Sequence, residues 1–191
     1  MQKRRFTFIW LLVACPWLLS ACGPMTIRDM TTQTLVPIQG WVLELHHEVT
    51  IPPDRTRLFF QDGRVSYGIN EYEPHCQLRV RPISPQPRPV YPDRFSIDKA
   101  FGDVDSIVSN GPVRLAAAGT AVVIGDGGDG DGPGQVIYFY YLGLHSDGQP
   151  DVSYLVCGGA LNDPAFARYP TLQEIRASLG DYATLITPGD R

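Results

Sequence analysis

Short runs of β-forming residues, separated by turn signals, dominate the chain from Trp41 onward and constrain its fold more than any other feature. The run CQLRVRP (76–82) alternates apolar and polar residues, which is typical of a strand with one buried face, and it places Cys76 on that face. The dipeptide Asp62-Gly63, which favours a tight hairpin turn, separates two such runs. Further strands are expected at 41–51, 57–61, 64–69, 94–97, 113–118, 120–125, 135–145 and 152–159.

One helix is expected, near the C-terminus. Thr171 and Glu174 have the spacing of a capping box, and Gly180 is suited to end the helix. Between residues 82 and 93, five prolines exclude an interior strand or helix and predict an exposed, extended connection. The pattern therefore predicts a mainly β fold: a single antiparallel β-sandwich or barrel-like domain with one C-terminal helix, with an α+β fold as the alternative.

The N-terminus has the layout of a secretory signal peptide. A basic start, KRR (3–5), precedes an apolar run at 6–19 that carries no charge. As a helix this run reaches about 21 Å at roughly 1.5 Å per residue, which is too short for a hydrocarbon core of about 30 Å. The sequence LSAC (19–22) resembles the bacterial lipobox, at which the cysteine receives diacylglycerol and becomes the first mature residue. This resemblance assigns lipidation to Cys22.

A lipidated Cys22 implies three segments: a lipoprotein signal peptide at 1–21, a lipidated N-terminus with a flexible tether at 22–40, and a β-rich periplasmic domain at 41–187. An Asp directly after the lipidated cysteine resembles an inner-membrane retention signal, but residue 23 is Gly. The expected location is therefore the cell outer membrane, lipid-anchored and facing the periplasm. Removal of 1–21 takes three of the 16 basic residues and moves the net charge from −4 to −7, and such an acidic chain without a basic cluster argues against nucleic acid. The expected partners are the membrane, through the N-terminal lipid, and an envelope protein.

Two cysteines, Cys76 and Cys157, are left once Cys15 is removed with the signal peptide and Cys22 is acylated. In an oxidising compartment two such cysteines favour a disulfide. The alternative is a nucleophilic or metal-binding thiol. Cys76 beside His75 is a poor arrangement for such a site, because neighbours on a strand point to opposite faces.

The stretch GDGGDGDGPG (125–134) is a weak candidate for a Ca²⁺ site. Its carboxylates, on Asp126, Asp129 and Asp131, are hard oxygen ligands on a glycine-rich backbone. However, their spacing fits no EF-hand loop, and no glycine-rich repeat of the Ca²⁺-binding kind recurs. The preferred interpretation is a flexible acidic hairpin loop between the strands at 120–125 and 135–145, and no cofactor is expected.

Catalytic signatures are scarce in this chain, which contains no GxSxG and no HExxH motif. Glu71 and Glu73 are expected on one face, solvated or paired with a nearby arginine. A non-enzymatic interaction or envelope-maintenance role is therefore expected. The alternative is an envelope hydrolase or a metal-dependent enzyme that uses His75 with Glu71 and Glu73.

Two longer stretches carry a family pattern. They are IPPDRTRLFFQDG, GINEYEPHCQLRV and YPDRFSI within residues 51–97, and YLVCGG and TLQEIRASLGDYATL within residues 152–185. This pattern resembles a family of uncharacterised proteobacterial envelope lipoproteins of unknown function. The resemblance supports the domain boundaries and the pairing of Cys76 with Cys157, and it implies no catalytic residue.

Overall fold

The structure, a computed structural model, describes residues 26–29, 34–38, 40–107, 113–117, 120–124 and 134–188. Within these residues the fold is mainly β and antiparallel with one short α-helix near the C-terminus, as predicted. The elements are β1 (Thr26–Asp29), β2 (Thr34–Pro37), β3 (Val42–Leu45), β4 (Val49–Ile51), β5 (Arg57–Gln61), β6 (Arg64–Ser66), β7 (His75–Val80), β8 (Arg88–Val90), β9 (Asp93–Ile107), β10 (Val113–Ala117), β11 (Thr120–Ile124), β12 (Gln135–His145), β13 (Val152–Gly158), α2 (Leu172–Leu179), the 3₁₀ turn η2 (Gly180–Tyr182) and β14 (Ala183–Ile186).

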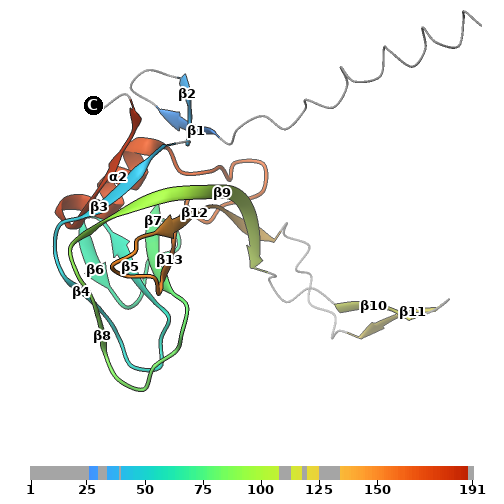
Figure 1. Ribbon diagram of the computed structural model, residues 1–191. Helices are drawn as coiled ribbons and strands as arrows, with labels where there is room; N and C mark the ends of the chain where they lie inside the picture. Colours follow the sequence, from blue (N-terminus) through green and yellow to red (C-terminus); the bar gives the residue numbers. More distant parts are fainter. Residues whose placement is uncertain are drawn as a thin grey trace, which may run out of the picture.

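Eight strands form one curled antiparallel sheet, a half-barrel, in the order β14-β3-β9-β12-β13-β7-β5-β6 (Figure 1). The long curved strand β9 pairs with β3 through its first residues and with β12 along most of its length. The other sheets in the described part of the chain are the strand pairs β1-β2, β4-β8 and β10-β11. Of the two predicted architectures, the barrel-like one is therefore present.

The two faces of the half-barrel sheet have different surroundings, because successive side chains of a strand point to opposite faces. The core face carries the main apolar cluster, and helix α2 packs on it through Leu172, Ile175 and Leu179. The opposite face, called the outer face below, carries a smaller cluster of Ile137, Phe139, Val156 and Leu161. Strand β7 contributes to both faces, with Cys76, Leu78 and Val80 in the core and His75, Gln77 and Arg79 on the outer face.

The predicted local signals for turns and caps are confirmed. Asp62 and Gly63 have positive φ values of 51° and 69° and connect β5 to β6, as a two-residue hairpin turn requires. At the start of α2, Glu174 N donates to Thr171 Oγ1 at 3.3 Å and Thr171 N donates to Glu174 Oε2 at 2.8 Å. Gly180 follows the helix with a positive φ of 55°.

The packed domain begins before Trp41, within the segment 22–40 that the sequence predicts as a flexible tether. Strands β1 and β2 pair there, and both Ile27 and Ile38 are buried in the main cluster. The Tyr140 hydroxyl also donates to the Thr26 carbonyl at 3.3 Å. Ile27 lies in β1 and Ile38 directly follows β2, and no alternation or helical periodicity in 22–40 indicates that the segment packs.

Strand pairing departs from the prediction at two places, and a short non-interior strand forms within the predicted proline-rich connection. β9 extends to Ile107, far beyond the strand expected at 94–97, because the equally extended β12 pairs with it. β11 pairs with β10 instead of β12, since consecutive strands with a short connection usually pair. The proline-rich connection includes β8, which pairs only with β4 in a two-stranded sheet where Pro89 breaks no interior ladder. Asp126, Asp129 and Asp131 lie outside the described residues, and their Ca²⁺ site stays a prediction.

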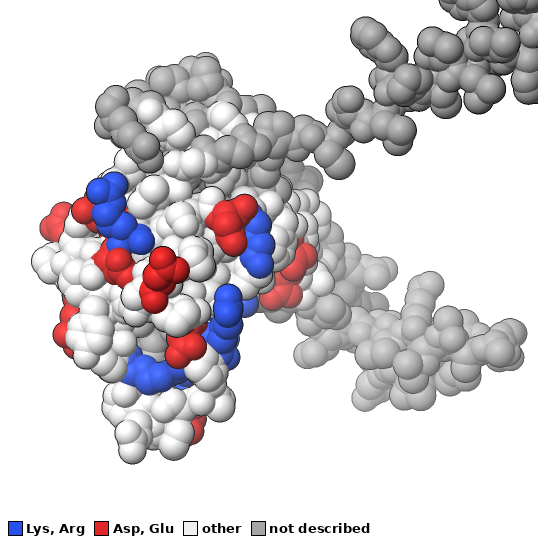
Figure 2. Space-filling view, in the orientation of Figure 1, with Lys and Arg blue, Asp and Glu red and all other residues white. Residues whose placement is uncertain are grey.

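Charged side chains of both signs are interspersed over the face of the molecule shown in Figure 2, and no broad surface of one sign forms there. None of the helices in the described ranges has the length and apolar character that a membrane span requires.

Candidate functional site

A pocket of about 210 Å³ on the outer face brings together residues from three regions of the sequence. Its polar lining includes His75, Gln77 and Arg79 of β7, and Arg57 of β5. Phe59, Phe139 and Tyr141 supply aromatic surface, while Glu71 comes from the connection before β7 and Asp105 from β9. The pocket therefore combines cations, carboxylates and aromatic rings within a small volume.

His75 is a buried polar residue of this pocket, with 1% of its surface exposed. Its Nδ1 lies 3.1 Å from the backbone carbonyl of Glu73. A carbonyl oxygen only accepts, so Nδ1 carries the proton and Nε2 carries the lone pair. Nε2 is buried and has no hydrogen-bond partner in the described part of the chain. The pocket thus contains an unsatisfied buried acceptor, which costs about 1–3 kcal/mol in a typical protein.

Two aromatic rings and one glycine hold the His75 ring in place. Phe59 and Phe139 contact it edge-on, with centroid distances of 6.5 and 5.8 Å. Gly158 lies opposite both His75 and Phe139 in the sheet, and a Cβ there would approach Phe139 Cε1 to 2.5 Å. The missing side chain at Gly158 therefore leaves the space in which His75 and Phe139 meet.

Burial lowers the pKa of His75 below its ordinary value of 6.5, because the imidazolium is desolvated; the bond to Glu73 and the charge of Glu71 oppose this shift. The unfolded chain consequently binds the proton more readily than the folded protein. The stability that neutral His75 provides is fully present above about pH 6.5 and is lost as pH falls through the lower folded pKa.

We expect the urea midpoint of the wild-type protein to decrease as pH falls below about 6.5, and the His75→Gln variant to lack this part of the decrease. His145→Gln is the matched control, because His145 is exposed and its imidazole lies 3.5 Å from the Asp147 carboxylate. The urea midpoints of all three proteins are measured between pH 5 and pH 8. This range covers about three pH units around the ordinary histidine pKa. Equal pH slopes for His75→Gln and wild type would contradict the assignment.

The structure brings only part of the predicted His75, Glu71 and Glu73 set together. Glu71 lines the same pocket as His75, whereas Glu73 contacts the imidazole through its backbone carbonyl alone. Both glutamate side chains are exposed. Across the described ranges, no three His, Cys, Asp or Glu side chains gather in a cluster that could hold a metal ion.

Arg57 and Arg79 face each other directly across β5 and β7 on the outer face. The Arg79 guanidinium donates twice to the Gln77 side-chain oxygen, from Nε at 3.2 Å and from Nη2 at 3.0 Å. It also lies 5.4 Å from the ring centroid of Tyr141, and Arg57 lies at the same distance from the ring of Phe59. Both cations are therefore positioned by neutral neighbours.

Cys76 and Cys157 form a disulfide between β7 and β13, which confirms their predicted pairing. They oppose each other in the register of the sheet and point into the core, on the other side of the strands from the pocket. The disulfide excludes the alternative of a thiol nucleophile or metal ligand at these two positions. Cys22, the predicted lipidation site, lies outside the described residues.

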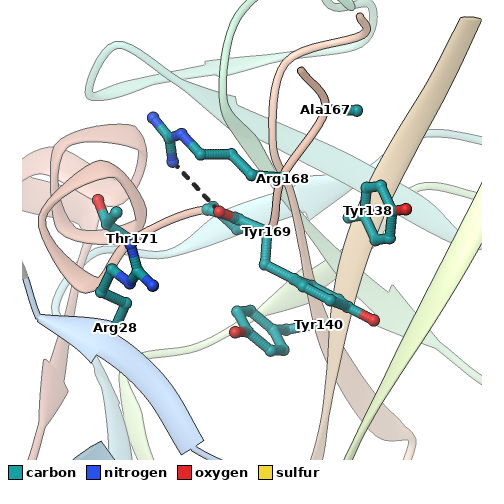
Figure 3. Close-up of a pocket in the computed structure, with 8 residues that line it drawn as sticks. Arg28, Tyr138, Tyr140, Ala167, Arg168, Tyr169 and Thr171 are labelled. Carbon is teal, nitrogen blue, oxygen red and sulfur yellow. Dashed lines mark hydrogen bonds between the residues drawn. The ribbon is translucent and has the colours of Figure 1, made fainter. Parts of the chain in front are cut away.

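A larger cavity of about 390 Å³ lies where β1, β12 and the segment before α2 meet (Figure 3). Tyr169 lies between Tyr140, on which it stacks at 4.5 Å, and Tyr138, which it meets edge-on at 5.0 Å. Burial raises the pKa of both the Tyr140 and Tyr169 phenols, so they stay protonated at neutral pH. Arg168 at its rim forms an ion pair with Glu174 at 2.6 Å. Arg168 is therefore paired and the Tyr140 hydroxyl donates to Thr26, whereas the buried Nε2 of His75 has no partner in the described residues, so we place the candidate site at the His75 pocket.

The sequence indicates His75, Glu71 and Glu73 but not the arginine pair. Gln77 and Arg79 alternate with Leu78 and Val80, which predicts a solvated outer face. The sequence shows an arginine in each of the strands expected at 57–61 and 76–82, but it does not indicate that these two strands pair. Their register, which sets Arg57 against Arg79, depends on tertiary structure.

Comparison with models of protein families, with curated proteins and with solved structures finds no match to this chain.

Proposed function

We propose that the chain is a lipoprotein anchored in the bacterial outer membrane, facing the periplasm, whose half-barrel domain binds an envelope component rather than catalysing a reaction. The basic and apolar N-terminal segments followed by LSAC (19–22) support the anchor. The Cys76–Cys157 disulfide supports an oxidising compartment. A single acyl chain binds a membrane only weakly, whereas two chains on one cysteine give a higher membrane affinity. This supports stable attachment.

The pocket on the outer face is the observation that carries the binding role. Arginine and aromatic side chains are enriched where proteins recognise partners, and here Arg57 and Arg79 accompany an aromatic cluster. Phe101 stacks on Tyr141 at 4.8 Å and is 42% exposed, which extends this cluster to the surface. Helix α2 packs on the core face, and this aromatic surface stays accessible.

The alternative function is an envelope hydrolase that uses His75 as a base beside Glu71. The free Nε2 lone pair of a neutral His75 favours it. Against it, Nε2 is covered by protein atoms, and the carboxylates of Glu71 and Glu73 are exposed. The binding role requires no proton transfer at Nε2, so we prefer it.

Replacing Cys22 with serine is expected to abolish membrane anchoring. Lipidation requires the cysteine thiol, so Cys22→Ser should accumulate unprocessed or unlipidated and leave the outer-membrane fraction. Cell fractionation with intact mass measurement tests this. The anchor proposal fails if Cys22→Ser is processed at the same site and still fractionates with outer membranes.

Site-specific crosslinking in living cells tests the binding role. A photoreactive amino acid at position 101 is expected to yield a discrete adduct, because Phe101 is exposed beside the pocket. The same amino acid at position 83, in the connection between β7 and β8, is the control, since Ile83 is 66% exposed. Adducts of equal yield at both positions, or none at position 101, would argue against binding through the outer face.

A further inference from the structure

The facing arginines are an unusual feature of the pocket. Like charges directly opposite each other on neighbouring strands destabilise a sheet. Arg57 and Arg79 occupy such a pair, and the ion pairs found in the described ranges, His145–Asp147 and Arg168–Glu174, involve neither of them. Gln77 and the rings of Phe59 and Tyr141 position the two guanidinium groups without neutralising them. An anion bound in the pocket that both arginines line would reduce their repulsion.

The pocket also contains carboxylate acceptors. Glu71 and Asp105 line it and are exposed, whereas the unsatisfied Nε2 of His75 is covered by protein atoms. These carboxylates oppose the binding of any anion, but hydroxyl groups on the same molecule can donate hydrogen bonds to them and offset this repulsion. The pocket therefore favours a ligand that carries one anionic group together with several hydroxyl donors.

The volume of the pocket and its aromatic rings restrict the class of ligand further. Pockets for drug-sized ligands usually enclose about 300–1,000 Å³. This pocket of about 210 Å³ suits a single sugar ring or a comparably small molecule. Phe59, Phe139 and Tyr141 provide apolar surface against which the C–H face of a sugar can pack.

We propose that this pocket binds a sugar acid, a monosaccharide unit with a carboxylate. The carboxylate lies between the guanidinium groups of Arg57 and Arg79, and ring hydroxyls donate to Glu71 and Asp105. Buried Gln77, 4% exposed, keeps Arg79 oriented through its two hydrogen bonds. The proposal rests on the binding role proposed above and specifies its ligand class.

Isothermal titration of the purified full-length protein tests the ligand class with matched sugars. D-Glucuronic acid is expected to bind at least about tenfold more tightly than D-glucose, which has the same ring without the carboxylate, since a charge-assisted bond contributes about 1.5–3 kcal/mol. N-Acetylmuramic acid and ketodeoxyoctonic acid then separate a cell-wall source from a lipopolysaccharide source. Equal binding of glucuronic acid and glucose, no binding of any sugar acid, or tighter binding of D-alanine would overturn the proposal.

Arginine variants test whether the sugar acid binds in this pocket. Arg57→Gln and Arg79→Gln should each weaken binding of the sugar acid by about tenfold or more. Arg81→Gln should bind as wild type, because Arg81 follows the same strand, is exposed and does not line the pocket. Urea denaturation should show Arg57→Gln no less stable than wild type, since it removes one of two opposed like charges. Equal binding by all three variants would refute the site.

The two proposals fail separately. If position 101 still yields its specific adduct in cells while no sugar acid binds, the binding role stands and the ligand class is wrong. If neither experiment succeeds, both proposals fall.

Discussion

Replacing Cys76 and Cys157 together with alanine is expected to lower the free energy of unfolding by up to about 4 kcal/mol, the largest effect predicted for this chain. The disulfide joins positions separated by 81 residues, and the closed loop contains β8 to β12. Without the bond the unfolded chain gains the conformational freedom of that whole loop. The melting temperature should fall by about 10 °C.

Urea and thermal denaturation of the double variant measure this effect. The wild-type protein in reductant is the control and should approach the behaviour of the variant. Substituting both cysteines avoids a single buried thiol that could pair with another molecule. Unchanged stability, or two reactive thiols in the unreduced wild-type protein, would contradict the prediction.

Gly180→Ala is expected to destabilise the protein by about 3 kcal/mol, through backbone strain and overpacking together. Gly180 ends α2 with φ 55° and ψ −136°, a conformation that L-residues with a side chain rarely adopt. A Cβ at this position would lie 2.3 Å from the Cα of Gly63 in the turn between β5 and β6. Because Gly63 N also donates to the Ser178 carbonyl at 3.2 Å, the turn has little freedom to move away.

Gly68→Ala is the matched control for this prediction. A Cβ at Gly68 would meet no atom within 4 Å, and its φ is not positive. The control should therefore change the free energy of unfolding by no more than about 0.5 kcal/mol. Urea denaturation curves of the two variants and wild type test this prediction. Similar midpoints for Gly180→Ala and Gly68→Ala would show that the close approach to Gly63 does not destabilise the Gly180→Ala variant.

Local sequence patterns predict the elements whose causes are local. The alternation in 76–82 places Cys76 on the buried side of β7 because side chains alternate along any strand. Asp62-Gly63 forms its turn because both residues tolerate positive φ. Thr171 and Glu174 satisfy each other's backbone donors within one helical turn, so the start of α2 is also visible in the sequence.

Elements that depend on contacts with distant segments of the chain cannot be predicted from local patterns. β1 is recognised as part of the domain only when Ile27 meets the main core, and β9 is long only because β12 extends beside it. The same limit applies to the candidate site. The sequence singles out His75, but its burial depends on the surrounding packing, which includes the rings of Phe59 and Phe139 from other strands.

The sequence by itself determined the mainly β class, the hairpin turn, the helix cap and the two cysteines of the disulfide, because each follows from periodicity, from the backbone preferences of single residues or from the number of cysteines left to pair. Tertiary structure alone decided that Arg57 faces Arg79, that Gly180 touches Gly63 and that the outer face holds a pocket. These features depend on strand register and on packing between segments far apart in the chain, where a shift of one residue would move every side chain to the other face.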